Sequence, residues 1–251
     1  MVLRGRHALV TGGGRGIGRA IAAALTKAGA AVTIVGRTEK PLAEAAGAGD
    51  AKGYVVADVT DANAVDHGVR QAVAARGPVD VLIANAGTAT AVPFAKATPE
   101  QFRDMFNVHV LGMLHPVQAV LGGMIERGFG RIVAVASIVG LRASPNVSPY
   151  TTAKHAMVGL VRSIALETAG SGVTANAVCP GYVDTDLIRG SLARLVEKGA
   201  SQQDALARFT SRVPVGRLVR PEEVAEAVVY FCSPGAAATT GSTLVIGADG
   251  A

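Results

Sequence analysis

A tyrosine and a lysine four residues apart, Tyr150 and Lys154, carry side chains that could perform acid–base chemistry. Residues at positions i and i+4 lie on the same face of a helix, so these two side chains would be neighbours there. A free tyrosine has a pKa of about 10, and a nearby ammonium group favours the phenolate and lowers that value. The pair could therefore transfer a proton near neutral pH, although Tyr and Lys also share helix faces by chance.

A glycine-rich stretch near the N-terminus, VTGGGRGIGRAIAAAL at residues 10–25, could hold an anion. Its glycines let the backbone approach a ligand closely, and a helix that starts there offers unpaired N–H groups. The spacing of Gly12, Gly16 and Gly18 differs from the common GxGxxG pattern of dinucleotide-binding loops. The stretch predicts a phosphate site, and a tight turn without a ligand is the alternative.

The elements that must position these residues follow from alternating apolar runs and helical stretches. The apolar runs are near-continuous and rich in Val, Ile and Ala, which is typical of strands buried on both faces of a sheet. The expected strands are His7–Thr11, Ala31–Val35, Gly53–Val56, Val79–Asn85, Gly130–Ser137, Thr174–Cys179 and Leu244–Ile246. The expected helices are Ile17–Ala28, Lys40–Ala45, Ala62–Ala75, Glu100–Arg127, Tyr150–Ala169 and Pro221–Cys232. The alternation predicts an α/β fold, a doubly wound parallel sheet of about seven strands with helices on both faces, in a single domain over residues 1–251.

One segment, residues 186–213, departs from this alternation. It has an amphipathic helical pattern and follows the end of a strand, where a segment covering a binding site would lie. We therefore expect it to form a lid over the substrate.

Composition excludes several classes of function. The chain has 251 residues, of which 49% are apolar and 17% charged, so a large buried core is expected and disorder is not. Its net charge of +5 is dispersed and aromatic residues make up 4%, which argues against a nucleic-acid surface. The apolar runs are interrupted before about 18 residues and no room for a signal peptide precedes the first strand, so we expect no membrane span and a cytoplasmic location. Cys179 and Cys232 are expected to be buried free thiols, and no metal site is expected.

Five motifs occur in order along the chain: the TGxxxGIG pattern at Thr11–Gly18, Asn85-Ala86-Gly87, Ser137, Tyr150-x-x-x-Lys154 and Pro180-Gly181. Together they resemble the pattern of the short-chain dehydrogenase/reductase family. Each is weak singly, but the whole series covers essentially the entire chain with family-like spacing. The pattern is most similar to 3-oxoacyl and polyketide ketoreductases and to 3-hydroxybutyrate dehydrogenases. The resemblance implies a Rossmann-type fold, a nicotinamide cofactor and a homotetramer formed through long helices.

The resemblance also implies roles for four side chains. Ser137 would hydrogen-bond the substrate oxygen, and Tyr150 would donate its proton during reduction. Lys154 would hold the ribose hydroxyls and tune Tyr150. Asn107 matches the family's fourth catalytic member, which supports a water that relays protons to the lysine. A polar helix residue without a catalytic role is the alternative for Asn107.

The cofactor expected from the sequence is NADP(H). Dinucleotide-binding sheets of this type usually place an acid after the second strand to bind the ribose 2′-hydroxyl, and here that position is Gly36. Arg37 follows it, and Arg15 lies in the glycine loop, so two cations could pair with a 2′-phosphate. Solvated surface arginines are the alternative. The resemblance implies that Asp58 contacts the adenine and that residues 85–87 lie near the ribose. The complete expected set for the cofactor is Gly12, Arg15, Gly16, Ile17, Gly18, Arg37, Asp58, Val59, Asn85, Ala86, Gly87, Tyr150, Lys154, Pro180, Gly181, Val183 and Thr185.

The substrate class is less strongly indicated. Ala89, Val139 and Val147 stand where the hydroxybutyrate enzymes place polar groups that hold a carboxylate. An apolar pocket suits a neutral or thioester-borne ketone better. The expected pocket also includes Tyr182, Leu187 and Ile188, although the two lid residues could equally be packing residues. We therefore predict an NADPH-dependent carbonyl reductase or alcohol dehydrogenase with a small-molecule ketone or alcohol as its substrate. An NAD(H)-dependent 3-hydroxybutyrate-type dehydrogenase and a non-catalytic NADP-sensing protein stay open.

Overall fold

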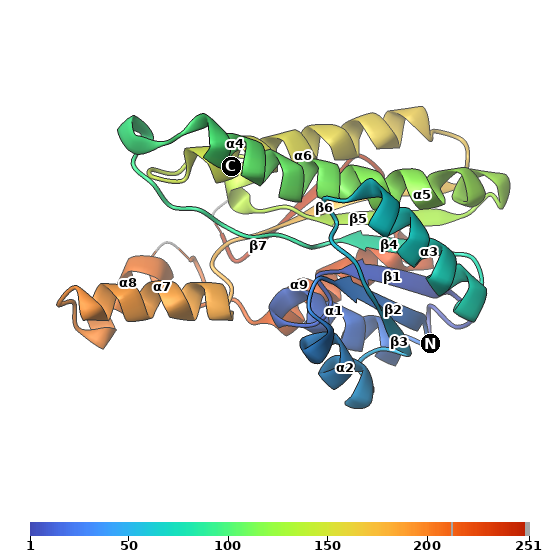
Figure 1. The fold of residues 1–251 in the computed structure, drawn as a ribbon, viewed down its shortest axis with the longest axis horizontal. Coiled ribbons are helices and arrows are strands. Elements are labelled where there is room, and N and C mark those ends of the chain that lie inside the picture. Colours follow the sequence, from blue (N-terminus) through green and yellow to red (C-terminus); the bar gives the residue numbers. More distant parts are fainter. Residues whose placement is uncertain (212, 249–251) are drawn as a thin grey trace.

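A computed structural model of the chain describes residues 1–211 and 213–248. All seven of its strands pair in parallel in one sheet, in the order β3-β2-β1-β4-β5-β6-β7 (Figure 1). The strands are β1 His7–Thr11, β2 Ala31–Gly36, β3 Gly53–Val56, β4 Val81–Ala84, β5 Gly130–Val135, β6 Val173–Pro180 and β7 Thr243–Ile246. The predicted parallel, doubly wound sheet is confirmed, with β4 and β5 ending one or two residues before the expected positions.

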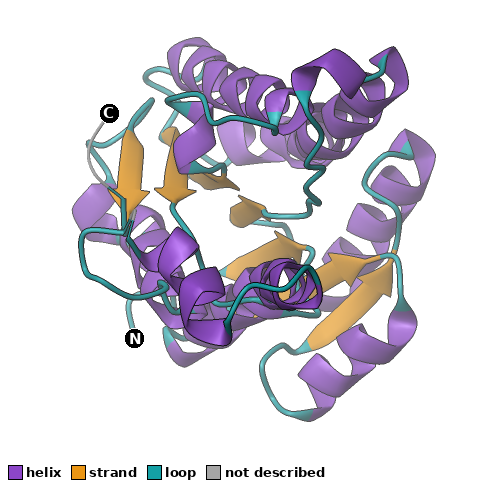
Figure 2. Ribbon diagram, turned by 90° about the vertical axis from the view of Figure 1, so that its left-hand side faces the viewer, coloured by secondary structure: helices purple, strands orange, loops and turns teal. Residues whose placement is uncertain are grey.

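Helices cover both faces of this sheet (Figures 1 and 2). α1, α2 and α9 lie on one face, and α3, α4, α5 and α6 on the other. Their bounds are α1 Gly16–Lys27, α2 Glu39–Gly47, α3 Ala62–Arg76, α4 Pro99–Phe106, α5 Gly112–Glu126, α6 Ser148–Glu167 and α9 Pro221–Cys232. The predicted helices are therefore present, with one exception in the segment that joins α4 to α5.

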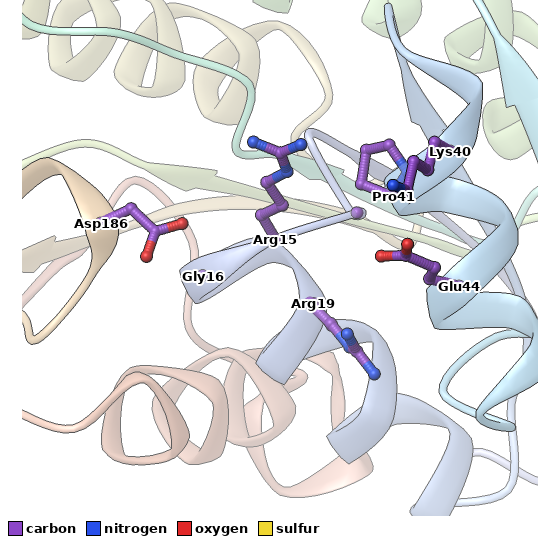
Figure 3. Close-up of a pocket in the computed structure, with 8 residues that line it drawn as sticks. Arg15, Gly16, Arg19, Lys40, Pro41, Glu44 and Asp186 are labelled. Carbon is purple, nitrogen blue, oxygen red and sulfur yellow. The ribbon is translucent and has the colours of Figure 1, made fainter.

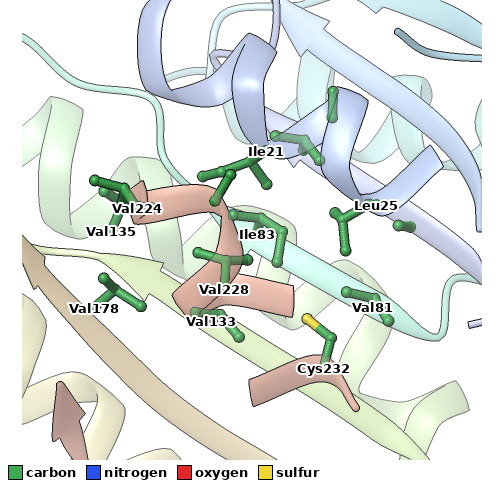
Figure 4. Close-up of a cluster of buried hydrophobic side chains, with 14 of the residues drawn as sticks. Ile21, Leu25, Val81, Ile83, Val133, Val135, Val178, Val224, Val228 and Cys232 are labelled. Atoms are coloured by element: carbon green, nitrogen blue, oxygen red, sulfur yellow. The ribbon is translucent and has the colours of Figure 1, made fainter. Parts of the chain in front are cut away.

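Two apolar cores lie on either side of the sheet. In one of them Ile21 and Leu25 of α1 and Val228 of α9 are fully buried against the sheet (Figure 4). Burying a side chain of this size contributes about 1.5–3 kcal/mol, so these contacts hold α1 and α9 against the sheet. Cys179 and Cys232 are buried and unbridged, as predicted.

The α4–α5 segment was expected to be one helix. It begins at Thr98, whose side chain and that of Gln101 form a reciprocal capping box. A π-helical turn over Asn107–Leu111 then separates α4 from α5. An 18-residue window within residues 99–126 has a mean hydropathy of 1.4, so by length and composition alone this segment could cross a membrane, a test that buried core helices also pass. In this fold the segment is a core helix, since Met113 and Met124 are buried beneath the sheet.

The expected lid is a pair of helices, α7 Asp186–Glu197 and α8 Gln202–Thr210. They project beyond the body of the sheet in Figure 1. α8 is anchored by buried Ala205 and by Phe209, whose ring meets that of Tyr182 edge to face at 5.0 Å. No residue of α7 is buried. Residue 212, at the end of the expected lid, lies outside the described residues.

Candidate active site

The motifs converge at the carboxyl ends of the strands. The strand order reverses between β1 and β4, and ligands of open α/β sheets bind at such a switch point. The glycine loop follows β1, Asn85 follows β4, Ser137 follows β5 and Gly181 follows β6. Sequence positions more than 160 residues apart therefore meet at one edge of the sheet.

The Ser137 side chain lies next to the Tyr150 hydroxyl, close enough to act on its pKa. Ser137 is 9% exposed, and its Oγ donates to the Pro180 carbonyl at 3.5 Å. α6 starts at Ser148, and both Pro149 and Tyr150 lie in its first turn. The end of β5, the end of β6 and the start of α6 therefore fix the two hydroxyls together.

Lys154 lies one turn further along α6 and is 3% exposed. Its Nζ donates to the Val135 carbonyl at 2.9 Å and to Met157 Sδ at 3.4 Å. The Nζ lies 5.6 Å from the centre of the Tyr150 ring. The structure thus brings Ser137, Tyr150 and Lys154 into one cluster.

Burial dominates the ionisation of this cluster. It raises the pKa of Tyr150 to about 12 and lowers the pKa of Lys154 to about 7. The Ser137 side chain acts in the opposite direction and lowers the Tyr150 pKa. The expected lowering of the Tyr150 pKa by Lys154 is wrong, because burial raises that pKa and the Lys154 Nζ donates to the Val135 carbonyl rather than to the phenol. Tyr150 is accordingly a protonated acid at neutral pH.

Asn107 is not part of the cluster. Its side chain is exposed, at the boundary between α4 and the π-helical turn. His109, two residues later, is 2% exposed, and its ring meets that of Tyr150 edge to face at 5.3 Å. The catalytic role of Asn107 therefore stays a prediction, while His109 is the neighbour that the structure places beside Tyr150.

The buried position of His109 could have been predicted from the sequence. Met105, His109, Gly112 and Met113 recur at the three- and four-residue spacing of a buried helix face, and all four are buried. Asn107 falls off this face. Reading the apolar stripe would have placed His109 toward the site.

The glycine loop is closely packed and fits a phosphate. A methyl group on Gly18 would come within 2.2 Å of the Gly12 carbonyl oxygen, so no side chain can be accommodated there. Asn85 Nδ2 donates to the Thr11 carbonyl at 3.0 Å and holds the loop against β4. No side chain caps the start of α1 and no acid lies in its first turn, so its N–H groups can bind an anion.

The loop after β6 lies opposite the glycine loop. A methyl group on Gly16 would come 3.4 Å from the side chain of Thr185, which precedes α7. The Gly181 amide donates to the Ile246 carbonyl at 2.9 Å, and Val183 is buried. The structure thus assembles these predicted cofactor residues at one edge, together with Pro180 and Ile17.

A cavity of about 430 Å³ adjoins the glycine loop (Figure 3). Arg15 and Lys40 bring positive charge to it, and Glu44 and Asp186 bring negative charge. Among the described residues neither Arg15 nor Lys40 forms an ion pair. Arg37 is not in the lining: its Nη1 lies 3.8 Å from Asp58 Oδ2. Lys40 lies in the first turn of α2. It was not predicted from the sequence, because near Gly36 only the adjacent Arg37 was considered.

The substrate side is less enclosed. The Val92 amide donates to the Asn146 carbonyl at 2.7 Å, which joins the loop bearing Ala89 to the loop bearing Val139 and Val147. Leu187 is 49% exposed, so the structure does not close α7 over the catalytic cluster. The pocket roles of Leu187 and Ile188 stay predictions.

A family model described as short chain dehydrogenase matches residues 6–194. The chain belongs to the short-chain dehydrogenase family. It is accordingly an oxidoreductase whose cofactor is a nicotinamide dinucleotide.

Other short-chain dehydrogenases align over nearly the whole chain. An acetoacetyl-CoA reductase of Rhizobium meliloti is 38% identical over 241 residues, which cover 95% of each chain. A D-beta-hydroxybutyrate dehydrogenase of Cupriavidus necator is 36% identical over 247 residues, covering 96% of each. The solved structure of an actinorhodin polyketide ketoreductase variant with NADPH has a TM-score of 0.89 and 38% identity, and covers 96% of this chain and 95% of that one.

Proposed function

We propose that this short-chain dehydrogenase is an NADPH-dependent ketoreductase that acts on a neutral or thioester-borne ketone. The observation that carries the proposal is the cluster in which buried Ser137 adjoins Tyr150 and buried Lys154 Nζ lies 5.6 Å from the centre of the Tyr150 ring. A non-catalytic NADP sensor would not need a tyrosine held protonated beside a serine at the carboxyl edge of the sheet.

The nicotinamide, when bound, supplies the hydride that no side chain can provide. The first turn of α1 would bind the pyrophosphate, and Lys154 would hold the ribose hydroxyls. Ser137 donates a hydrogen bond to the carbonyl oxygen, where negative charge develops. Tyr150, protonated because burial raises its pKa to about 12, donates its hydroxyl proton to the same oxygen.

Preference for NADPH over NADH is supported by charge. Arg15 and Lys40 line the cavity next to the glycine loop and form no ion pair within the described residues, so both can meet a 2′-phosphate. Gly36 ends β2 without the acid that would repel it. The similar actinorhodin ketoreductase structure contains NADPH. Arg37, released from Asp58, would be a third cation.

The substrate proposal relies on the absence of a side-chain cation at the predicted pocket positions. Ala89, Val139 and Val147 offer no side-chain donor. Two lid arginines are engaged elsewhere: Arg189 Nε lies 2.8 Å from Asp184, and Arg194 bonds to the Gly190 carbonyl within α7. A buried carboxylate would lose its hydration there without compensation. The names of the acetoacetyl-CoA reductase and polyketide ketoreductase relatives agree with a thioester-borne ketone.

The test is NADPH oxidation measured against acetoacetyl-CoA, neutral cyclic ketones and acetoacetate, with Tyr150→Phe as the inactive control. Turnover of the thioester or neutral ketones supports the proposal. Preferential turnover of acetoacetate with NADH would favour the hydroxybutyrate-type dehydrogenase. Tight NADPH binding with no turnover of any ketone would favour the sensor. We also propose that the protein is a homotetramer in the cytoplasm and consists of one domain with a lid at 186–213. The proposal includes no nucleic-acid or membrane partner.

A further inference from the structure

Asn146 has a backbone conformation that is rare for any residue except glycine. Its φ is 61°, and within the described part of the chain it is the only non-glycine residue with a positive φ. Asparagine adopts this left-handed conformation more readily than most residues that carry a Cβ. Pro145 precedes it, and a proline followed by a residue with positive φ is typical of a type II turn. The loop sequence therefore favours the conformation locally.

The backbone of Asn146, rather than its side chain, makes the contact with the rest of the site. The side chain is exposed, whereas the carbonyl oxygen accepts a hydrogen bond from the Val92 amide at 2.7 Å. The direction of a carbonyl follows from the dihedral angles of its own residue. The left-handed conformation of Asn146 thus aims this oxygen at the loop that follows β4.

Few other backbone bonds hold the two loops. Within the described residues, the hydrogen bond to Val92 is the one backbone–backbone bond of residues 143–146. Residues 88–92 have one further anchor, the Thr88 carbonyl, which accepts from His109 Nε2 at 2.7 Å. A single bond between Val92 and Asn146 therefore joins two loops that are otherwise weakly held.

The two loops lie on either side of the catalytic tyrosine. One carries Ala89 and is anchored to His109, whose ring meets the Tyr150 ring at 5.3 Å. The other carries Val147 and leads into the first turn of α6, where Tyr150 lies. The groups that serve the cofactor are held elsewhere, since Lys154 Nζ donates to the Val135 carbonyl in β5. A change in the spacing of the loops should therefore act on the ketone and not on the cofactor.

We propose that Asn146 is a positioning residue that determines specificity for the ketone. By accepting the Val92 hydrogen bond, its carbonyl holds the loop that bears Ala89 against the loop that bears Val147, and so fixes the width of the substrate pocket beside Tyr150. The inference rests on the proposed ketoreductase function. Because the role belongs to the backbone conformation, glycine should replace Asn146 without loss, whereas a β-branched residue should not.

Two substitutions separate the backbone conformation from the side chain. Asn146→Gly removes the amide and keeps the left-handed conformation. Asn146→Val disfavours that conformation, so the carbonyl turns away from Val92. We expect Asn146→Val to raise the ketone KM at least about fivefold, with kcat and the Kd for NADPH within about twofold of wild type. Asn146→Gly should stay within about twofold of wild type in all three quantities.

Asn63→Val is the matched control, because it makes the same exchange at an exposed position of α3 where φ is not positive. It should leave the ketone KM unchanged. If Asn146→Val does not fold, as judged by circular dichroism, Asn146→Ala replaces it, since alanine is also disfavoured at positive φ. The inference is overturned by a ketone KM within about twofold of wild type, by an equal defect in Asn146→Gly, or by a loss confined to kcat.

Hydrogen exchange of the Val92 amide separates this inference from the proposed function. NMR of the ¹⁵N-labelled, cofactor-free protein should show a protected Val92 amide in wild type and in Asn146→Gly, and exchange at least about tenfold faster in Asn146→Val. If wild type reduces no ketone, the proposed function fails, and this exchange still decides whether Asn146 holds the loops together. An unprotected Val92 amide in wild type, or equal protection in Asn146→Val, would contradict the inference.

Discussion

The catalytic cluster and the lid are built differently, although both belong to one site. Ser137 and Lys154 are buried and hydrogen-bonded to the neighbouring strands β6 and β5 of the sheet. α7 has no buried residue; its Arg189 pairs with Asp184 just before the helix, and its Arg194 bonds to the Gly190 carbonyl within it. Proton-transfer chemistry is therefore set by the core, while substrate choice depends on exposed helices. Substitutions in the two regions should differ in size and in the step that they affect.

The largest effect is expected at Tyr150. Tyr150→Phe keeps the ring against His109 and removes the proton donor, so kcat should fall by about 10³-fold while the Kd for NADPH stays near that of wild type. Steady-state turnover and fluorescence titration of NADPH measure the two quantities. Retention of most activity would make Tyr150 a packing residue.

Lys154 should affect both binding and turnover. Lys154→Met keeps an unbranched chain of similar length and removes the ammonium. We expect kcat to fall by about 10²-fold and the Kd for NADPH to rise severalfold, because the ribose hydroxyls lose their donor. A loss of turnover with unchanged NADPH affinity would remove the ribose role from Lys154.

Lys154 should also make stability depend on pH in the cofactor-free protein. Its pKa is lowered from 10.5 to about 7 by burial, so between these values the unfolded chain binds more protons than the folded one. The free energy of unfolding should then rise with pH above 7, by at most about 1.4 kcal/mol per unit. Urea unfolding at pH 7, 8 and 9 checks this against Lys154→Met, in which the same cysteines titrate. Equal pH slopes for the two proteins would refute it.

Cofactor choice should show an intermediate effect. Arg15→Ala and Lys40→Ala should each lower kcat/KM for NADPH about tenfold and leave NADH use nearly unchanged, because each removes one cation from the 2′-phosphate site. Arg37→Asp tests the prediction made from the sequence and should act in the same direction. Arg70→Ala, which removes an exposed arginine on α3 paired with Asp66, is the matched control. Equal use of NADH by wild type would contradict the assignment.

The smallest effect is expected in the lid. Leu187→Ser should raise the ketone KM about threefold without changing kcat, if α7 closes over the substrate and Leu187 then contacts it. Leu206→Ser, at an exposed position of α8, is the control. A kcat effect larger than that of the cofactor variants would mean that the lid contributes to the chemical step.

The contrast between the buried catalytic cluster and the exposed lid also explains which features could be predicted from the sequence. Buried parallel strands are continuous apolar runs, so the sheet and the residues at its carboxyl edge, Ser137 and Tyr150 among them, were predictable. Asn107 was predicted rather than His109, two positions later, because the family resemblance outweighed the pattern of the buried helix face. Lys40 approaches Arg15 only in three dimensions. The placement of α7 could not be predicted, because exposed amphipathic helices are fixed by few contacts.

The central claim is that a site built on the buried sheet transfers a hydride and a proton to a ketone that carries no free carboxylate. The most direct measurement compares kcat/KM for acetoacetate and for its ethyl ester at saturating NADPH. The ester should be preferred by at least about tenfold, a difference of roughly 1.4 kcal/mol, because the acid would be buried against Ala89, Val139 and Val147 without a cation. Preference for the free acid would contradict the account and would mean that an arginine such as Arg142, Arg189 or Arg194 reaches the pocket.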